Sequence, residues 1–140
     1  MSKSVQVEVD ALLRFLKSRF SVPVSAGWPQ YSSQGLYVFP YAIAPENPLR
    51  QDLSHGSSEE NISLPSFVVQ VLLIANPESD LSLLGEAINA LHEYPVFEEH
   101  PLSVRASMNL LSIEQLTQLF LARNEPLRLC ASYTLQTIHQ

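Results

Sequence analysis

The residues of this sequence that could do chemistry gather in one stretch, from His92 to His100. His92-Glu93 is followed by Glu98-Glu99-His100, and imidazole and carboxylate groups are common zinc ligands. A zinc-binding helix of the H-E-x-x-H type needs a second histidine where this sequence has Val96. Pro95 also separates the two groups, so they do not share one helical face. We therefore expect exposed residues at a helix end and no metal site.

Two further side chains, His55 and Cys130, have types that serve in acid–base or nucleophilic catalysis. His55 lies between Ser54 and Gly56, without the strand-turn-helix pattern of a nucleophile elbow. Cys130 has no partner base beside it in the sequence, and most lone cysteines are small core residues. The chain has only four glycines and no glycine-rich phosphate loop. The sequence predicts no catalytic residues, no cofactor and no enzyme activity.

The elements that would position any site belong to a small, acidic chain. Its 140 residues are 46% hydrophobic and 16% charged, a composition typical of one globular domain. The net charge of −6 argues against nucleic acid as a partner, because phosphate binding needs clustered Lys and Arg. The first ten residues lack the apolar core of a signal peptide, and no apolar run approaches the roughly 18 residues of a membrane helix. We expect an intracellular domain that does not insert into a membrane.

The charges are distributed unevenly along the chain. Residues 1–20 carry four bases and two acids, whereas residues 46–100 carry ten acids and one base, Arg50. Complementary charges of this kind allow a domain to bind a basic partner or a rotated copy of itself. The alternative is an acidic face that serves only solubility.

Hydrophobic periodicity predicts an α+β fold in a single domain, with one mixed or antiparallel sheet flanked by about three helices. The predicted helices span 4–20, the segment between Asp80 and Pro95, and 113–123. The predicted strands span 36–44, 66–75, 103–111 and 127–138, and residues 21–35 form a loop or a short edge strand. A polar loop occupies about 45–65.

Three details of these elements carry specific expectations. Ser66 to Ala75 is apolar on both faces, which is typical of a central strand, and Pro40 indicates a bulge or an edge position. Ser112 and Gln115 form a capping-box pattern at the start of the third helix. The final strand has one apolar face, and its other face carries Arg128, Ser132, Thr134 and Gln136, as an edge or solvated strand would.

Three stretches together resemble one known family. They are residues 83–97 (LLGEAINALHEYPVF), residues 41–50 (YAIAPENPLR) and residues 125–133 (EPLRLCASY). In this order they resemble the cap, or tail-terminator, proteins of contractile injection systems, which are phage-tail-like particles. The likeness runs from about Val5 to Ile138, so the whole of 1–140 is expected to be one cap domain.

The resemblance implies a structural protein without catalytic, cofactor or metal residues. It implies a homo-oligomeric ring of six subunits that closes the end of an inner tube and its contractile sheath. The partners would then be other copies of the chain and the tube and sheath proteins, and assembly would take place in the cytoplasm as part of the particle. The alternative is a small adaptor or ligand-binding module that uses the aromatic segment Trp28 to Tyr41.

Two groups of residues are predicted to form interfaces. In the turn of Glu46, Asn47, Leu49 and Arg50, the leucine would anchor the turn and the arginine would contact a neighbouring component of the ring. Alternatively, Arg50 pairs locally with Glu46 or Asp52. The polar face of the final strand, with Arg128 and Thr134, is predicted to lie at a sheet edge and to receive an extended arm of a sheath subunit.

Overall fold

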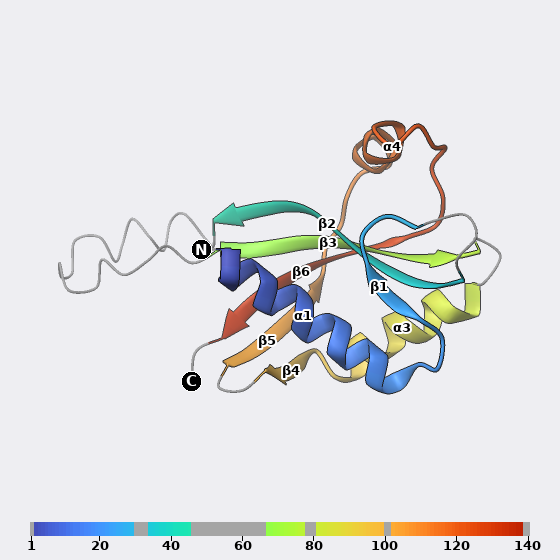
Figure 1. Cartoon of the computed structure of the whole chain (residues 1–140). Helices are drawn as coiled ribbons and strands as arrows, with labels where there is room; N and C mark the ends of the chain where they lie inside the picture. The colour runs from blue at the N-terminus through green and yellow to red at the C-terminus, as the bar shows by residue number, and fades with distance from the viewer. Residues whose placement is uncertain (1, 30–33, 46–66, 78–80, 100–101, 139–140) are drawn as a thin grey trace, which may run out of the picture.

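The computed structural model describes residues 2–29, 34–45, 67–77, 81–99 and 102–138 (Figure 1). Within these residues the chain forms three helices and six strands. In order they are α1 (Ser2–Arg19), β1 (Val24–Ala26), β2 (Gly35–Pro45), β3 (Phe67–Asn76), α3 (Leu81–Glu93), β4 (Val96–Glu99), β5 (Leu102–Met108), α4 (Ile113–Leu121) and β6 (Ala131–Ile138). The strands form one sheet in the order β1-β2-β3-β6-β5-β4. The predicted α+β fold with one mixed sheet is confirmed.

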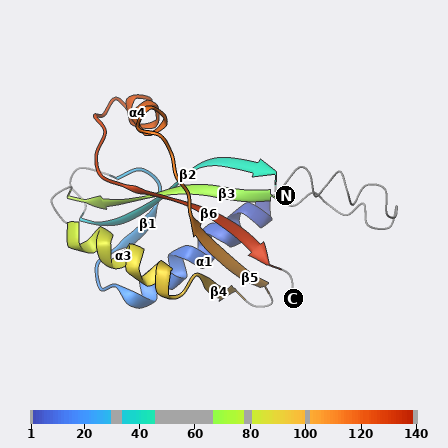
Figure 2. The same cartoon turned by 180° about the vertical axis from the view of Figure 1, so that it is seen from behind.

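The sheet is covered on both faces. Figures 1 and 2 show α1 and α3 on one face and α4 on the other. Val69, Val71 and Leu73 of β3 belong to the main core beneath α1 and α3, and Leu72 and Ile74 belong to a second cluster on the α4 side. All five of these side chains are fully buried. The prediction that this strand is central is therefore confirmed, because a strand with two apolar faces needs cover on both.

The β1–β2 end of the sheet has two local irregularities. β1 pairs with β2 in parallel, at one edge of the sheet, as the predicted short edge strand. The pairing of β2 with β3 shifts register between Pro40 and Ala42, which confirms the predicted bulge. Gly35 has a φ of +150° and lies directly against the carbonyl of Pro23, where a side chain would collide with the backbone. This glycine allows β2 to begin close to the chain that leads into β1.

The strand β4 was not predicted from the sequence. It pairs with β5 in antiparallel fashion and forms the other edge of the sheet. The ring of Phe97 stacks on Phe15 of α1 with 5.1 Å between centroids, and the Arg19 guanidinium lies 4.3 Å from the ring centre of Tyr94. With four residues, two of them glutamate, β4 has too little apolar alternation to be recognised; its aromatic contacts to α1 hold it in place.

The prediction that the final strand lies at an edge is wrong. β6 lies between β3 and β5, with Thr134 opposite Gln70 on one side and opposite Ser107 on the other. It also begins at Ala131 rather than Leu127, and Leu127 and Leu129 before it are exposed. The alternation of apolar and polar residues indicates which face of a strand packs against the core. It does not indicate whether the strand is hydrogen-bonded to neighbours on one side or on both. The polar face of β6 is turned toward the α4 side, where Ser132 is buried within a hydrogen-bonded group.

Within the described residues, no helix combines the length and the apolar character needed to cross a membrane.

Candidate functional site

The connection between β5 and β6, residues 109–130, rises above the second face of the sheet, and we call it the α4 flap (Figure 1). The predicted capping box at the start of its helix is present. The Gln115 N–H donates to Ser112 Oγ at 3.1 Å, and the Ser112 N–H donates to Gln115 Oε1 at 3.0 Å. This cap satisfies two N–H groups that would otherwise lack partners, so α4 begins at a fixed point.

One side of α4 anchors the flap to the sheet. Phe120 is fully buried, and Leu116 and Leu119 pack beside it against Leu72 and Ile74 of β3. These three α4 residues recur at three- and four-residue spacing, so they form one apolar stripe. The opposite side of the helix is left facing away from the sheet.

Trp28 holds the middle of the flap, at and just after the end of α4. Its indole Nε1 donates a hydrogen bond of 2.9 Å to Glu125 Oε2. Its ring makes edge contacts with Phe39 and Phe120, each with 4.9 Å between centroids. The Arg123 guanidinium lies 5.3 Å from the indole centre. Trp28, Phe39 and Tyr41 of the aromatic segment are thus engaged in contacts within the protein, while Tyr31 lies outside the described residues; these contacts argue against the adaptor alternative.

The start of the flap is held by polar contacts to the sheet. The hydroxyls of Tyr41 in β2 and Ser132 in β6 are 2.8 Å apart and share a hydrogen bond. The side-chain amide of Asn109 donates to the Tyr41 hydroxyl at 3.3 Å, and its backbone N–H donates to the Ser132 carbonyl at 2.8 Å. Because Asn109 begins the flap, this group fixes the point where the flap leaves the sheet.

The end of the flap is held by Arg128. Its Nη2 donates to the Ala75 carbonyl at 2.6 Å and to Asn76 Oδ1 at 3.3 Å, at the end of β3. Its buried Nε has no hydrogen-bond partner among the described residues. Burial raises the pKa of the nearby Cys130 thiol to about 11, and the positive charge of Arg128 opposes that shift only in part. Cys130 is thus a protonated thiol at neutral pH, and thiols react as thiolates.

The outer surface of the flap exposes a group of large apolar side chains. Leu110 is 90% exposed, Ile113 73%, Leu121 60% and Leu129 58%. Ile113 is the first residue of α4 and Leu121 is the last, so apolar side chains are exposed at both ends of the helix. Apolar groups gathered on one projecting element are typical of a surface that contacts another protein. The flap is therefore a candidate interaction surface, and sequence reasoning missed it because Leu110 and Leu129 also fit the predicted strands 103–111 and 127–138.

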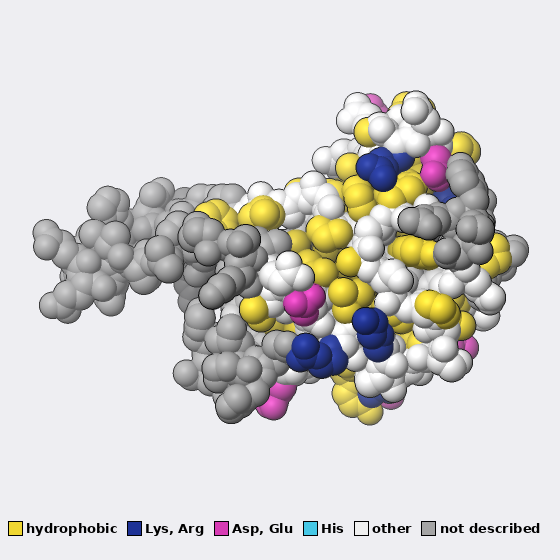
Figure 3. Space-filling model, in the orientation of Figure 1, with side chains coloured by type: hydrophobic (Ala, Val, Ile, Leu, Met, Phe, Trp, Pro, Cys, Tyr) yellow, Lys and Arg dark blue, Asp and Glu magenta, His cyan; other side chains and the backbone are white. Residues whose placement is uncertain are grey.

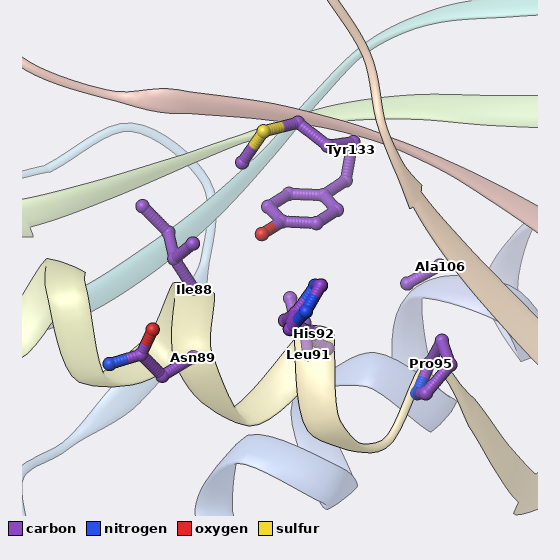
Figure 4. Close-up of a pocket in the computed structure, with 8 residues that line it drawn as sticks. Ile88, Asn89, Leu91, His92, Pro95, Ala106 and Tyr133 are labelled. Carbon is purple, nitrogen blue, oxygen red and sulfur yellow. The ribbon is translucent and has the colours of Figure 1, made fainter.

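A second feature is a hollow of about 460 Å³ between α3 and β5, on the opposite face of the sheet (Figure 4). It is lined by Ile88, Asn89, Leu91, His92, Pro95, Ala106, Met108 and Tyr133. Tyr133 of β6 points toward α3, and burial raises the pKa of its hydroxyl. The lining is mostly apolar, which suits contact with the side chains of another protein.

The residues predicted from the sequence as interface residues are only partly described. Glu46, Asn47, Leu49 and Arg50 lie outside the described residues, as does the polar loop at about 45–65 except Pro45, the last residue of β2. Arg128 holds the flap to β3, and Thr134 lies in the interior of the sheet. The structure does not bring these two groups together in one described site, and their part in an interface stays a prediction.

The stretch from His92 to His100 is the other group singled out by residue type. His92 and Glu93 are exposed at the end of α3, as expected, while His100 lies outside the described residues. Among the residues that the structure describes, no three His, Cys, Asp or Glu side chains are close enough together to hold a metal ion.

Comparison with known proteins assigns the chain to a family. Residues 9–139 match the Pvc16 N-terminal domain, so the chain belongs to the Pvc16 N-terminal domain family. The fold is similar to the sheath/tube terminator of an extracellular contractile injection system, PVC, solved by cryo-electron microscopy in its extended state. The TM-score is 0.62 at 14% identity, over 97% of this chain and 56% of that one, so this chain spans little more than half of the terminator's length. No curated protein matches the chain. The resemblance to tail terminators that the sequence indicated is confirmed.

Proposed function

We propose that this protein is a structural cap, or tail terminator, which closes the end of the inner tube and contractile sheath of a phage-tail-like injection particle. The observation that carries the proposal is the match of residues 9–139 to the Pvc16 N-terminal domain. The fold shared with a sheath/tube terminator over 97% of the chain supports the same role.

The architecture fits a protein whose work is contact rather than catalysis. The sheet has helical cover on both faces, and the α4 flap is held at its start, middle and end by Asn109, Trp28 and Arg128. A flap fixed at three points presents Leu110, Ile113 and Leu121 in a defined position. Preorganised surfaces of this kind lose little conformational entropy when they bind. We propose that the protein has no enzymatic activity.

The cap forms a ring of identical subunits, and we propose six. The ring binds the tube and the sheath, without nucleic acid and without insertion into a membrane. Assembly takes place in the cytoplasm, as part of the particle. The turn of Glu46, Asn47, Leu49 and Arg50 follows directly after β2 and remains a proposed contact to a neighbouring component of the ring.

Deletion of the gene from cells that make the particle tests this function. Electron microscopy of the deletion strain is expected to show tubes and sheaths of uncontrolled length, or sheaths lost from their tubes. Re-expression of the wild-type chain should restore a uniform length. Particles of normal length and with normal ends in the deletion strain would contradict the proposal.

A further inference from the structure

The C-terminal half of α1 carries an exposed pair of bases, Arg14 and Lys17, which we call the α1 basic patch. Residues three apart on a helix lie side by side, so the two side chains share the outer face of α1. Figure 3 shows Lys and Arg side chains gathered over α1 on this side of the molecule. The opposite face of the helix, with Leu12 and Leu16, is buried in the core.

The outer face of α3 carries the opposite charge. Glu86 and Glu93 are both exposed and are two helical turns apart, with Asn89 between them on the same face. The helix contains no Lys or Arg, so nothing within α3 neutralises this pair, the α3 acidic patch. Asn89 also lines the apolar hollow described above, together with Ile88 and His92 of the same helix. The two carboxylates therefore stand at the rim of an apolar surface.

The two patches lie on different helices, which cover the same face of the sheet (Figure 1). In Figure 1 α1 lies in front of α3, and in Figure 2, seen from behind, α3 lies in front of α1. Two different patches that complement each other are what a head-to-tail contact between identical subunits requires. A contact of this type repeats from each subunit to the next and closes into a ring when the rotation allows it.

We propose that the α1 basic patch of one copy binds the α3 acidic patch of the next copy. The ammonium and guanidinium groups meet Glu86 and Glu93, while the aliphatic stems of Arg14 and Lys17 lie over the hollow beside Met108. A contact with charged rims and an apolar centre follows the usual anatomy of protein interfaces. The inference rests on the proposed ring of identical subunits and names the surfaces that build it.

Charge reversal tests the contact. The variant Arg14→Glu/Lys17→Glu makes both patches acidic, and Glu86→Lys/Glu93→Lys makes both basic. Each is expected to raise the concentration at which half of the protein is assembled by at least about tenfold, as measured by analytical ultracentrifugation at low salt and neutral pH. The variant with all four substitutions has complementary patches again and should assemble like the wild type. Arg105→Glu and Glu98→Lys, at exposed sites outside both patches, serve as controls that should change little.

Mixing the two reversed variants gives a second, independent result. Each variant alone repels itself, but the acidic chain can bind the basic chain through both of its patches. An equimolar mixture should therefore assemble, with the two chains alternating, whereas neither variant does so alone. Alternation closes only a ring with an even number of subunits, so the mass of the mixed assembly also tests the proposed six.

The inference is overturned if the wild type stays monomeric at its highest soluble concentration and low salt. It is also overturned if either reversed variant assembles like the wild type, or if neither the fourfold variant nor the mixture regains assembly. Circular dichroism checks that each variant folds; one that does not is replaced by its glutamine version, for which a smaller loss is expected. Salt-sensitive rings together with normal particles in the deletion strain would refute the proposed function and leave this contact intact.

Discussion

The carboxylate of Glu8 in α1 accepts two hydrogen bonds from Thr137 in β6. The Thr137 backbone N–H donates to Glu8 Oε2 at 3.0 Å, and the Thr137 hydroxyl donates to the same oxygen at 2.8 Å. Glu8 is only 1% exposed, so both bonds form away from solvent. The pairing of β6 with β3 ends at Gln136, so the glutamate takes the place of a β3 partner for Thr137, which still pairs with Val104 of β5 on its other side. The first helix is thereby fixed to the end of the last strand.

Removal of the Thr137 hydroxyl should weaken this connection. Thr137→Val keeps the shape of the side chain and the backbone donor, but it loses one hydrogen bond to a buried carboxylate. We expect the free energy of unfolding to fall by about 2 kcal/mol, as measured by urea denaturation. Thr137→Ser keeps the hydroxyl and should lose less. Equal stability of Thr137→Val and the wild type would show that the bond contributes nothing.

The sequence predicted well those parts of the fold that depend on neighbours along the chain. The helix cap at Ser112, the bulge at Pro40 and the central strand from Phe67 each leave a local signature, in residue type or in periodicity. Glu8 shows the opposite case, because its partner is 129 residues away and nothing near position 8 indicates it. The place of β6 was missed for the same reason, since strand order is set by pairing between distant segments.

Trp28 should contribute strongly to the stability of the α4 flap. Trp28→Ala removes the hydrogen bond to Glu125 and the ring contacts to Phe39 and Phe120, so we expect a loss of about 3 kcal/mol. Trp28→Phe keeps a ring and should lose only about 1–2 kcal/mol, mainly from the hydrogen bond. Circular dichroism is the measurement of choice, because Trp28 is the only tryptophan of the chain. If Trp28→Ala unfolds at the wild-type urea concentration, the flap is not held by this residue.

The position of Thr134 inside the sheet gives a sharp prediction for proline. Thr134→Pro removes a backbone donor from a strand that is paired on both sides, and proline is found in sheets essentially only at edges and bulges. We expect a loss of at least about 2 kcal/mol and little folded protein at 37 °C. Thr134→Val, which keeps the N–H, should remain folded. A folded, stable Thr134→Pro variant would contradict the strand order.

The thiol of Cys130 should react slowly below strongly alkaline pH. Because burial raises its pKa to about 11, the alkylation rate of the native protein should rise with pH up to about 11, whereas the urea-unfolded chain should level off near pH 9. Between pH 9 and 11 the Cys130 thiol is deprotonated in the unfolded state but still protonated in the folded state. The free energy of unfolding therefore falls as pH rises from about 9 to 11. Cys130→Ala should show a smaller fall. Native alkylation that levels off near pH 9 would disprove the raised pKa.

The candidate surfaces were less predictable than the fold. The uneven distribution of charge along the chain indicated a basic first helix, and the structure shows which of its bases, Arg14 and Lys17, share an exposed face. The exposed leucines of the flap gave no such signal. Leu127 and Leu129 extend the alternation of β6 toward the N-terminus in the sequence, but the strand begins only after them, at Ala131, because Arg128 binds the end of β3.

Whether this protein caps the end of a tube and its sheath can be seen by high-resolution cryo-electron microscopy of the intact particle. We expect to find this fold at one end of the particle only, as a ring of subunits that contacts both the last tube layer and the last sheath layer. Within that ring, α1 of each subunit should face α3 of the next. Density for the chain along the length of the particle, at both of its ends, or nowhere in it would contradict the role of a cap.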